Sequence, residues 1–360
     1  MPGRLGQIPS SRIARWAAAL GVGALAGYVC TLLHTPIPWM LGPLFTLAFL
    51  RIVGVDIGAP PPTRYFGQWI IGTSLGLYFT PQVVDLVTGI WYLLAVGAVF
   101  AIALGYVSGV ALARLAHLDK TTGIFASVPG GAAEMATLGD RFGGRMDRIA
   151  AAQSIRILIV VGLVPAAITA LGFHGADAYV QGAKTFDRGG FALLMAATLA
   201  GSLVFQRLKM PNAYVLGSLA VTIPLTASQI DLSTVPPLAS NIGQCLLGCA
   251  LGSRFQPDFL HGAHRFVFAV AATVVLSIIL SAGFGTGLAW AAGMPPATLM
   301  LGTAPGGIAE MCITAKVLQL GVPVVTAFHI TRLVVILLAT PLVFVRARHW
   351  YRRRRRRDGR

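Results

Sequence analysis

Two copies of one short stretch decide how this chain folds. The first is Val128-Pro129-Gly130-Gly131-Ala132-Ala133-Glu134-Met135, and the second is Ala304-Pro305-Gly306-Gly307-Ile308-Ala309-Glu310-Met311. Each stretch interrupts an apolar segment, and together they hold the only two glutamates of the chain, Glu134 and Glu310. Proline removes a backbone donor and glycine admits unusual dihedral angles. Each stretch therefore predicts a broken helix or a re-entrant hairpin.

The composition around these breaks is that of a membrane protein. The chain has 360 residues, of which 56% are hydrophobic and 11% are charged, and its mean hydropathy is +0.74. A soluble domain carries about 25% charged residues. The apolar runs have the length of a membrane-spanning helix, whereas a β-barrel would alternate polar and apolar residues. These features predict an all-α polytopic membrane protein.

The two halves of the chain match beyond the glutamates. A set of residues from the first half recurs in the second half with the spacing that separates Glu134 from Glu310: Gly67, Gln68, Gly72, Leu75, Gly76, Phe79 and Pro81. Arg156 and Arg332 keep the same spacing. The chain is therefore interpreted as a duplication. We expect a first membrane repeat at 1–172, a linker at 173–186, a second membrane repeat at 187–345 and a basic cytoplasmic tail at 346–360.

The charges predict that the two repeats are inverted. Lys and Arg accumulate on the cytoplasmic side of a membrane protein. Arg114 and Lys120 lie in one loop, whereas the corresponding loop, 293–296, has no charge. Conversely, 34–36 carries no formal charge, whereas its counterpart holds Arg207 and Lys209. We expect an inverted-topology duplication of about ten transmembrane helices plus the two Pro-Gly-Gly segments, with both termini in the cytoplasm.

The two breaks are the first candidates for a binding site. Irregular backbone at membrane depth is tolerated where it lines a cavity, and inversion would bring the breaks together near the midplane. The candidates for substrate or ion binding are Pro129, Gly130, Gly131, Glu134, Pro305, Gly306, Gly307 and Glu310. The glutamates are either carboxylates that cap a helix N-terminus or carboxylates that bind a coupling ion or substrate. Both roles are compatible.

Polar residues of the neighbouring helices complete the candidate set. Arg156 and Arg332 are expected either to form salt bridges with the glutamates or to clamp an anionic substrate. Gln153 and His329 occupy equivalent positions one turn earlier, and His329 is either a packing residue or a ligand. Gln68 and Gln244 either form hydrogen bonds between helices or line the site.

No cofactor or metal is predicted. The seven histidines are scattered, and the spacing of Cys245 and Cys249 lacks a second pair of zinc ligands. Cys30, Cys245, Cys249 and Cys312 all have apolar neighbours and are expected to be reduced packing residues. The net charge is +16, and Arg352–Arg357 form an unbroken run. We expect this run to bind anionic lipid at the membrane surface rather than nucleic acid.

With these motifs the chain resembles the membrane AbrB duplication family over nearly its full length. The Pro-Gly-Gly-x-Ala-Glu-Met pair and the Gly-Gln-x3-Gly-x2-Leu-Gly-x2-Phe-x-Pro pair carry the resemblance. The family has two inherited labels, a regulator of gene expression and an ammonia monooxygenase. Its architecture is also similar to the inverted-repeat cation/proton antiporter and anion transporter superfamily. The resemblance implies a bacterial inner-membrane protein.

The leading hypothesis is a secondary transporter that moves a small polar or charged solute by alternating access. One alternative is a membrane sensor that affects gene expression indirectly, because the sequence shows no soluble DNA-binding domain. A second alternative is an oxidase of the monooxygenase type, which would need clustered metal ligands. We expect no enzymatic activity. A homodimer is one option for the oligomeric state.

Overall fold

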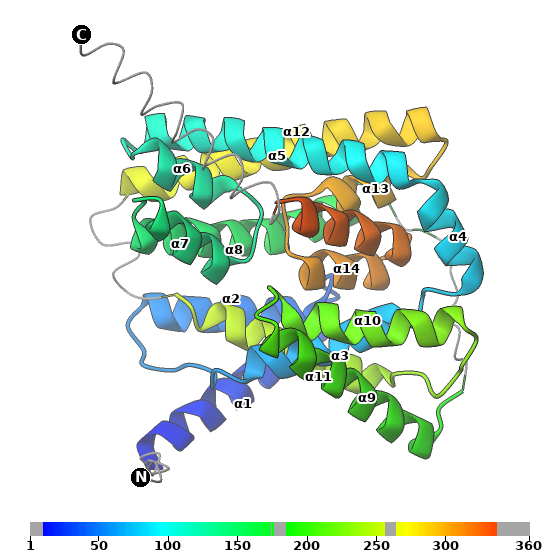
Figure 1. Ribbon diagram of the computed structural model, residues 1–360. Helices are drawn as coiled ribbons and strands as arrows, with labels where there is room; N and C mark the ends of the chain where they lie inside the picture. Colours follow the sequence, from blue (N-terminus) through cyan, green and yellow to red (C-terminus); the bar gives the residue numbers. More distant parts are fainter. Residues whose placement is uncertain (1–9, 174, 176–184, 256–263, 337–360) are drawn as a thin grey trace. The chain divides into compact units, whose positions relative to one another are not determined.

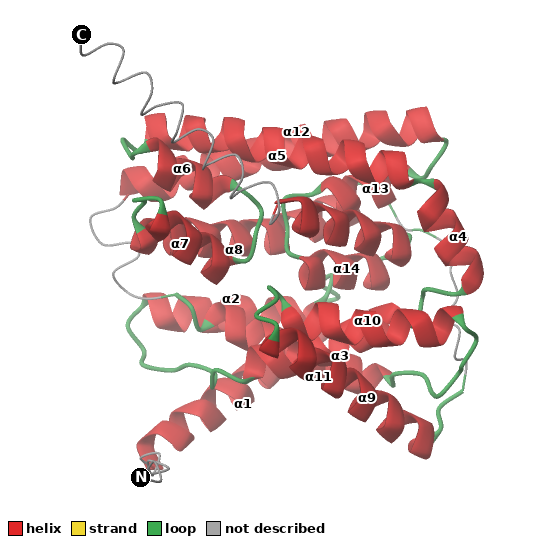
Figure 2. Cartoon of the chain, in the orientation of Figure 1, coloured by secondary structure: helices red, strands yellow, loops and turns green. Residues whose placement is uncertain are grey.

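The computed structural model describes residues 10–173, 175, 185–255 and 264–336. Every regular element in these ranges is an α-helix (Figure 2). The predicted all-α class is therefore confirmed for this part of the chain. Most of the predicted linker 173–186, the end of the second repeat and the basic tail 346–360 lie outside the described residues.

The order of helices in the first half recurs in the second half. Helix α2 (Pro38–Ile52) corresponds to α10 (Ala213–Ala227), and both have the same length. Helices α6 (Lys120–Ser127) and α7 (Ala132–Arg141) correspond to α13 (Pro296–Thr303) and α14 (Ile308–Val317), and each pair brackets one Pro-Gly-Gly stretch. The other helices are α1 (Ser10–Leu32), α3 (Thr63–Gly76), α4 (Pro81–Gly89), α5 (Trp91–Leu115), α8 (Met146–Ala170), α9 (Arg188–Arg207), α11 (Pro237–Gly252), α12 (His264–Ala292) and an unlabelled helix at Val322–Ile336.

Five described helices are long and apolar enough to cross a membrane. They are α1 from Arg12 onward, α5, α8, α9 and α12. Helices α3 and α4 meet the same criteria only as a pair, with a bend of 93° between them. The sequence did not predict this bend; Pro81 begins the second helix of the pair, where its missing N–H costs no helical hydrogen bond. Helices α2, α10 and Val322–Ile336 are shorter apolar helices.

The chain divides into two compact units, and each unit combines helices from both halves of the sequence. The first unit comprises Met1–Asp85, Leu158–His264 and Cys312–Pro323. Within it, α2 packs against α1 and α11, while its counterpart α10 packs against α9 and α3. Each of these two helices therefore has one neighbour from its own half and one from the other half.

Glycines at equivalent positions allow the helices of the first unit to approach closely. A Cβ atom at Gly248 of α11 would come within 2.5 Å of the Met40 carbonyl oxygen in α2. A Cβ atom at Gly72 of α3 would come within 2.9 Å of the Val215 carbonyl oxygen in α10. Gly72 and Gly248 are equivalent in the duplication, and Met40 and Val215 occupy the same position in their helices. The contacts between the two halves are therefore reciprocal.

The second unit comprises Leu86–Ile157, Arg265–Met311 and the chain from Val324. Its long helices α5 and α12 lie side by side (Figure 1). The rings of Phe100 and Phe284 stack with centroids 3.8 Å apart. Further along α5 the Ser108 hydroxyl lies 2.8 Å from that of Ser277. Residue numbers rise along α5 while they fall along α12, so these equivalent helices run antiparallel.

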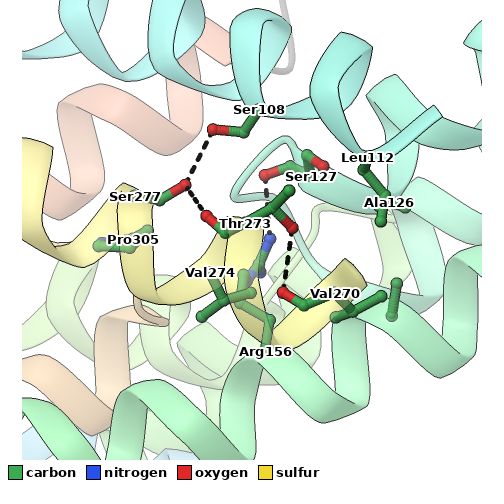
Figure 3. Close-up of a pocket in the computed structure, with 11 residues that line it drawn as sticks. Ser108, Leu112, Ala126, Ser127, Arg156, Val270, Thr273, Val274, Ser277 and Pro305 are labelled. Carbon is green, nitrogen blue, oxygen red and sulfur yellow. Dashed lines mark hydrogen bonds between the residues drawn. The ribbon is translucent and has the colours of Figure 1, made fainter. Parts of the chain in front are cut away.

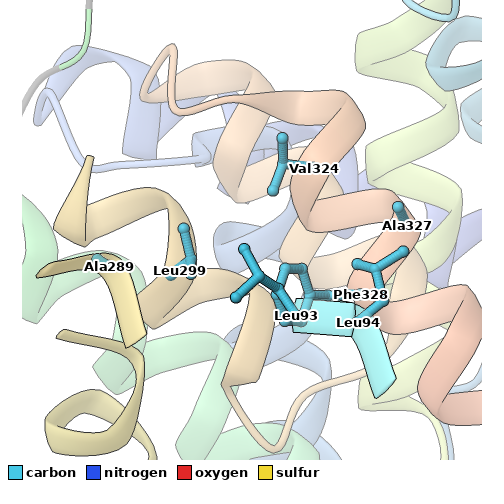
Figure 4. Close-up of a cluster of buried hydrophobic side chains, with 7 residues drawn as sticks. All are labelled: Leu93, Leu94, Ala289, Leu299, Val324, Ala327 and Phe328. Atoms are coloured by element: carbon cyan, nitrogen blue, oxygen red, sulfur yellow. The ribbon is translucent and has the colours of Figure 1, made fainter. Parts of the chain in front are cut away.

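A buried apolar cluster holds the helix at 322–336 within the second unit (Figure 4). It consists of Leu93 and Leu94 from α5, Ala289 from α12, Leu299 from α13, and Val324, Ala327 and Phe328. The Phe328 ring lies close to Gly97, where a Cβ atom would meet it at 2.6 Å. Between helices in a bilayer, close packing of this kind supplies much of the association energy. The cluster thereby fixes the helix that carries His329 and Arg332.

Candidate functional site

Both Pro-Gly-Gly stretches break a helix, as predicted. Helix α6 ends before Val128, which has extended backbone angles (φ −61°, ψ 127°). Helix α13 ends before Ala304, which has nearly the same angles (φ −56°, ψ 143°). A new helix begins shortly after each proline, at Ala132 and at Ile308. The last carbonyl groups of α6 and α13 consequently have no helical partner of their own.

The two glutamates fold back over the glycine that precedes their helix. A Cβ atom at Gly131 would collide with the Glu134 carboxylate, and one at Gly307 would collide with the Glu310 carboxylate. The same geometry in both halves places each carboxylate near the free N–H groups of a first helical turn, where negative charge is stabilised. Oε2 of Glu134 is buried without a hydrogen-bond partner among the described residues. Glu310 is itself buried.

The two arginines donate to backbone carbonyl groups at the breaks. Nη1 of Arg156 lies 3.0 Å from the Val128 oxygen and 3.5 Å from the Ser127 oxygen. Nη1 of Arg332 lies 2.6 Å from the Ala304 oxygen, and its Nη2 donates to the Gly306 oxygen. Both side chains are 4% exposed. Charged donors therefore bind carbonyl groups at both breaks, and the Val128 oxygen also accepts from the Gly130 N–H. This role was not predicted from the sequence.

Gln153 and His329 both form hydrogen bonds with backbone carbonyl oxygens before the breaks, although their side chains differ. Nε2 of Gln153 lies 2.9 Å from the Phe125 oxygen and 3.0 Å from the Val128 oxygen. Nε2 of His329 lies 3.0 Å from the Leu301 oxygen, and Leu301 is the counterpart of Phe125. Both side chains are fully buried. Each residue thus fixes the end of the short helix before its break.

Two adjoining cavities lie where the breaks meet in the second unit. The larger, of about 330 Å³, is lined by Ser108, Leu112, Ala126, Ser127, Ala152, Arg156, Val270, Thr273, Val274, Ser277 and Pro305 (Figure 3). The smaller, of about 260 Å³, is lined by Ala101, Leu104, Gly105, Ser127, Pro129, Ser277, Thr303, Pro305 and Arg332. Three pairs of equivalent residues therefore contribute to the two cavities: Ser127 and Thr303, Pro129 and Pro305, and Arg156 and Arg332.

The polar part of both linings consists of hydroxyls and guanidinium groups. Ser108 and Ser277 form a hydrogen-bonded pair across α5 and α12, and Ser277 also donates to the Thr273 oxygen at 2.7 Å. Neither lining includes an Asp or Glu residue. The Glu310 carboxylate is close enough to Arg156 for an electrostatic attraction. A carboxylate from the second half of the chain thus attracts the guanidinium group of an arginine from the first half.

The hydroxyl residues of the cavities were not predicted from the sequence. Ser127 and Thr303 sit at equivalent positions just before the two Pro-Gly-Gly stretches, so the duplication could have identified them. Ser108, Thr273 and Ser277 carry no such signal, because isolated hydroxyls are common in apolar helices.

Some predicted residues are not among the residues that line these cavities. The linings include neither glutamate and none of Gly130, Gly131, Gly306 and Gly307. Gln68 and Gln244 belong to α3 and α11 of the first unit. Nε2 of Gln68 donates to Asn212 at 3.3 Å, which fits the predicted hydrogen bond between helices. Within the described residues no group of three or more His, Cys, Asp or Glu could hold a metal ion.

Comparisons with known proteins agree with the motifs. The family described as transition state regulatory protein AbrB matches residues 39–348, a range that includes both breaks and both arginines. The chain is 24% identical over 350 residues to "Uncharacterized protein YhjN" of Bacillus subtilis (strain 168), which covers 89% of this chain and 90% of that relative. It is 23% identical over 326 residues to "Putative regulator AbrB" of Escherichia coli (strain K12), which covers 90% of this chain and 92% of that relative.

Proposed function

This chain belongs to the AbrB family, and from that premise we propose that it is a secondary transporter that moves a small polar or charged solute by alternating access. The proposal places it in a bacterial inner membrane with about ten spans in two inverted repeats and with both termini in the cytoplasm. The long apolar helices are compatible with a membrane location. Neither the label of monooxygenase nor that of regulator explains the two broken helices.

The antiparallel arrangement of α5 and α12 supports the inversion. These helices are equivalent in the duplication, and both are long enough to span a bilayer. A parallel duplication would run them in the same direction through the membrane. The contacts of Phe100 with Phe284 and of Ser108 with Ser277 require opposite directions. The unequal charge of corresponding loops is independent support.

The observation that carries the proposal is the shared cavity region. Each half contributes a broken helix, a proline and a buried arginine to it. Broken helices that meet at a repeat interface are the usual way in which secondary transporters build a solute site. Because equivalent residues of inverted repeats are exposed to opposite sides, such a site can open to either side when the repeats exchange conformations.

Uptake into proteoliposomes tests the proposal. Vesicles with purified protein would receive a mixture of small carboxylates, amines and amino acids under an imposed proton or sodium gradient, and mass spectrometry would measure what accumulates. We expect at least one solute to accumulate above the level of protein-free vesicles. Loss of that uptake in a Ser277→Ala variant would assign it to the cavity. No accumulation of any solute under either gradient would count against transport.

The second candidate function is a sensor that binds a solute without moving it. It is favoured by the name of the Escherichia coli relative, which describes that protein as a regulator. A sensor and a transporter share the need for a buried solute site. Solute binding by detergent-purified protein, combined with no uptake into proteoliposomes, would favour the sensor.

A further inference from the structure

Arg156 and Arg332 are equivalent in sequence, but their hydrogen bonds differ. Arg332 uses both terminal nitrogens on carbonyls of its own break, with Nη1 on Ala304 and Nη2 on Gly306. Arg156 uses only Nη1, which donates to Ser127 and Val128. The two arginines differ at Nη2, because no described residue accepts from the Nη2 of Arg156. The Nε of Arg156 is also buried without a hydrogen-bond partner among the described residues. One edge of the Arg156 guanidinium is therefore open.

The open edge has a defined chemistry. Nε and Nη2 present two parallel N–H groups, and this fork matches the two oxygens of a carboxylate. A buried donor without an acceptor is costly and calls for an explanation. Because Arg156 is 4% exposed and lines the larger cavity, a solute in that cavity could supply the acceptor.

The residues that line the larger cavity limit the polarity and charge of the rest of the solute. Leu112, Val270 and Val274 give it apolar sides, whereas Ser108 and Ser277 provide hydroxyls. Only one guanidinium edge is open, so one negative charge is matched and a second would be left without a partner.

We propose that the larger cavity binds a small monocarboxylate. The carboxylate pairs with Nε and Nη2 of Arg156, the hydroxyls of Ser108 and Ser277 lie beside it, and a short hydrocarbon body packs against Leu112, Val270 and Val274. Arg332 is a positioning residue that holds the second break. This inference deepens the proposed function by naming the solute class of the same site, and therefore rests on it.

Calorimetric titration of the full-length protein in detergent provides the test. The probes are propionate and lactate, with propionamide as the neutral isostere and inorganic phosphate and chloride as other anions. We expect heat of binding with the two carboxylates and none with propionamide, because the amide cannot accept two charge-assisted hydrogen bonds. Equal binding of propionamide, or binding of phosphate or chloride in preference to both carboxylates, would overturn the assignment.

Variants locate the binding to the open edge. Arg156→Lys keeps the positive charge but loses the fork, and should weaken propionate binding by roughly tenfold or more. Arg148→Lys is the matched control on the same helix, because Arg148 pairs with Asp147 and lines neither cavity. If Arg156→Lys does not fold, Ser277→Ala replaces it, and should weaken binding several-fold. Unchanged affinity in a folded Arg156→Lys or Ser277→Ala protein would overturn the proposal.

The design separates this inference from the proposed function. Calorimetry in detergent measures binding without flux, so carboxylate binding that depends on Arg156 supports the inference even if vesicles show no uptake. Uptake restricted to an amine or another cation, with no carboxylate binding, would retain transport and overturn the inference.

Discussion

At the residue scale, the polar side chains of this site act mainly on backbone carbonyls. Arg156 and Arg332, and likewise Gln153 and His329, hold equivalent carbonyls at the ends of α6 and α13. The duplication made it predictable that these positions act alike. The carbonyls could not be identified as the partners, because a sequence shows side chains but not which backbone groups a break leaves open.

Arg332→Gln should destabilise the protein by about 2–5 kcal/mol, because two buried carbonyl groups lose a charged donor. Chemical unfolding of the purified protein in detergent, followed by circular dichroism, would measure the loss. Arg148→Gln is the control and should change stability by less than about 1 kcal/mol, as partly exposed ion pairs contribute little. Equal stability of Arg332→Gln and the wild type would contradict the structural role of Arg332.

Glu310→Gln should leave the fold intact, because glutamine can still reach the free N–H groups of a first helical turn. It should also tighten propionate binding several-fold, since the Glu310 carboxylate competes electrostatically for Arg156. Titration calorimetry of Glu310→Gln beside Glu134→Gln provides the comparison. Weaker binding by Glu310→Gln would show that the carboxylate helps to hold the solute instead of competing with it.

At the element scale, the broken helices were predictable and their surroundings were not. Proline followed by two glycines in an apolar segment rarely continues a helix. Both helix breaks occur at the Pro-Gly-Gly stretches. The 93° bend between α3 and α4 was not predicted, because a sequence shows where a helix is interrupted but not the angle at which the chain continues. The division into two units that each combine helices from both halves was also not predicted. No local sequence pattern shows which helices of one half pack against helices of the other half.

Lys316 offers a test of the hydrogen bonds within the first unit. Its Nζ lies 2.6 Å from the Ser74 hydroxyl and 3.1 Å from the Ser240 hydroxyl. Ser74→Ala should lower stability by about 1–3 kcal/mol because it removes a buried partner of a charged group. Lys316→Met removes the charge and fills similar volume, and should be neutral or stabilising. A reversed order of the two variants in thermal unfolding would contradict this account.

At the scale of the whole molecule, the account depends on two repeats of opposite orientation. Arg114 lies in the last turn of α5 and Lys120 is the first residue of α6, whereas the corresponding residues 293–296, which lead into α13, are uncharged. Reporter fusions after Lys120 should therefore signal the cytoplasm, and fusions after Gly293 should signal the opposite side. Signals on the same side from both fusions would remove the inversion.

The central claim is that one cavity region, shared by both repeats, opens alternately to the two sides of the membrane. Ser127 and Thr303 are its equivalent residues, one from each repeat. Ser127→Cys and Thr303→Cys would be introduced singly after Cys30, Cys245, Cys249 and Cys312 are replaced, and a membrane-impermeant maleimide would be applied to either face of oriented vesicles. The account predicts that each cysteine reacts from both faces. Reaction of both cysteines from a single face, whatever solute is present, would contradict alternating access.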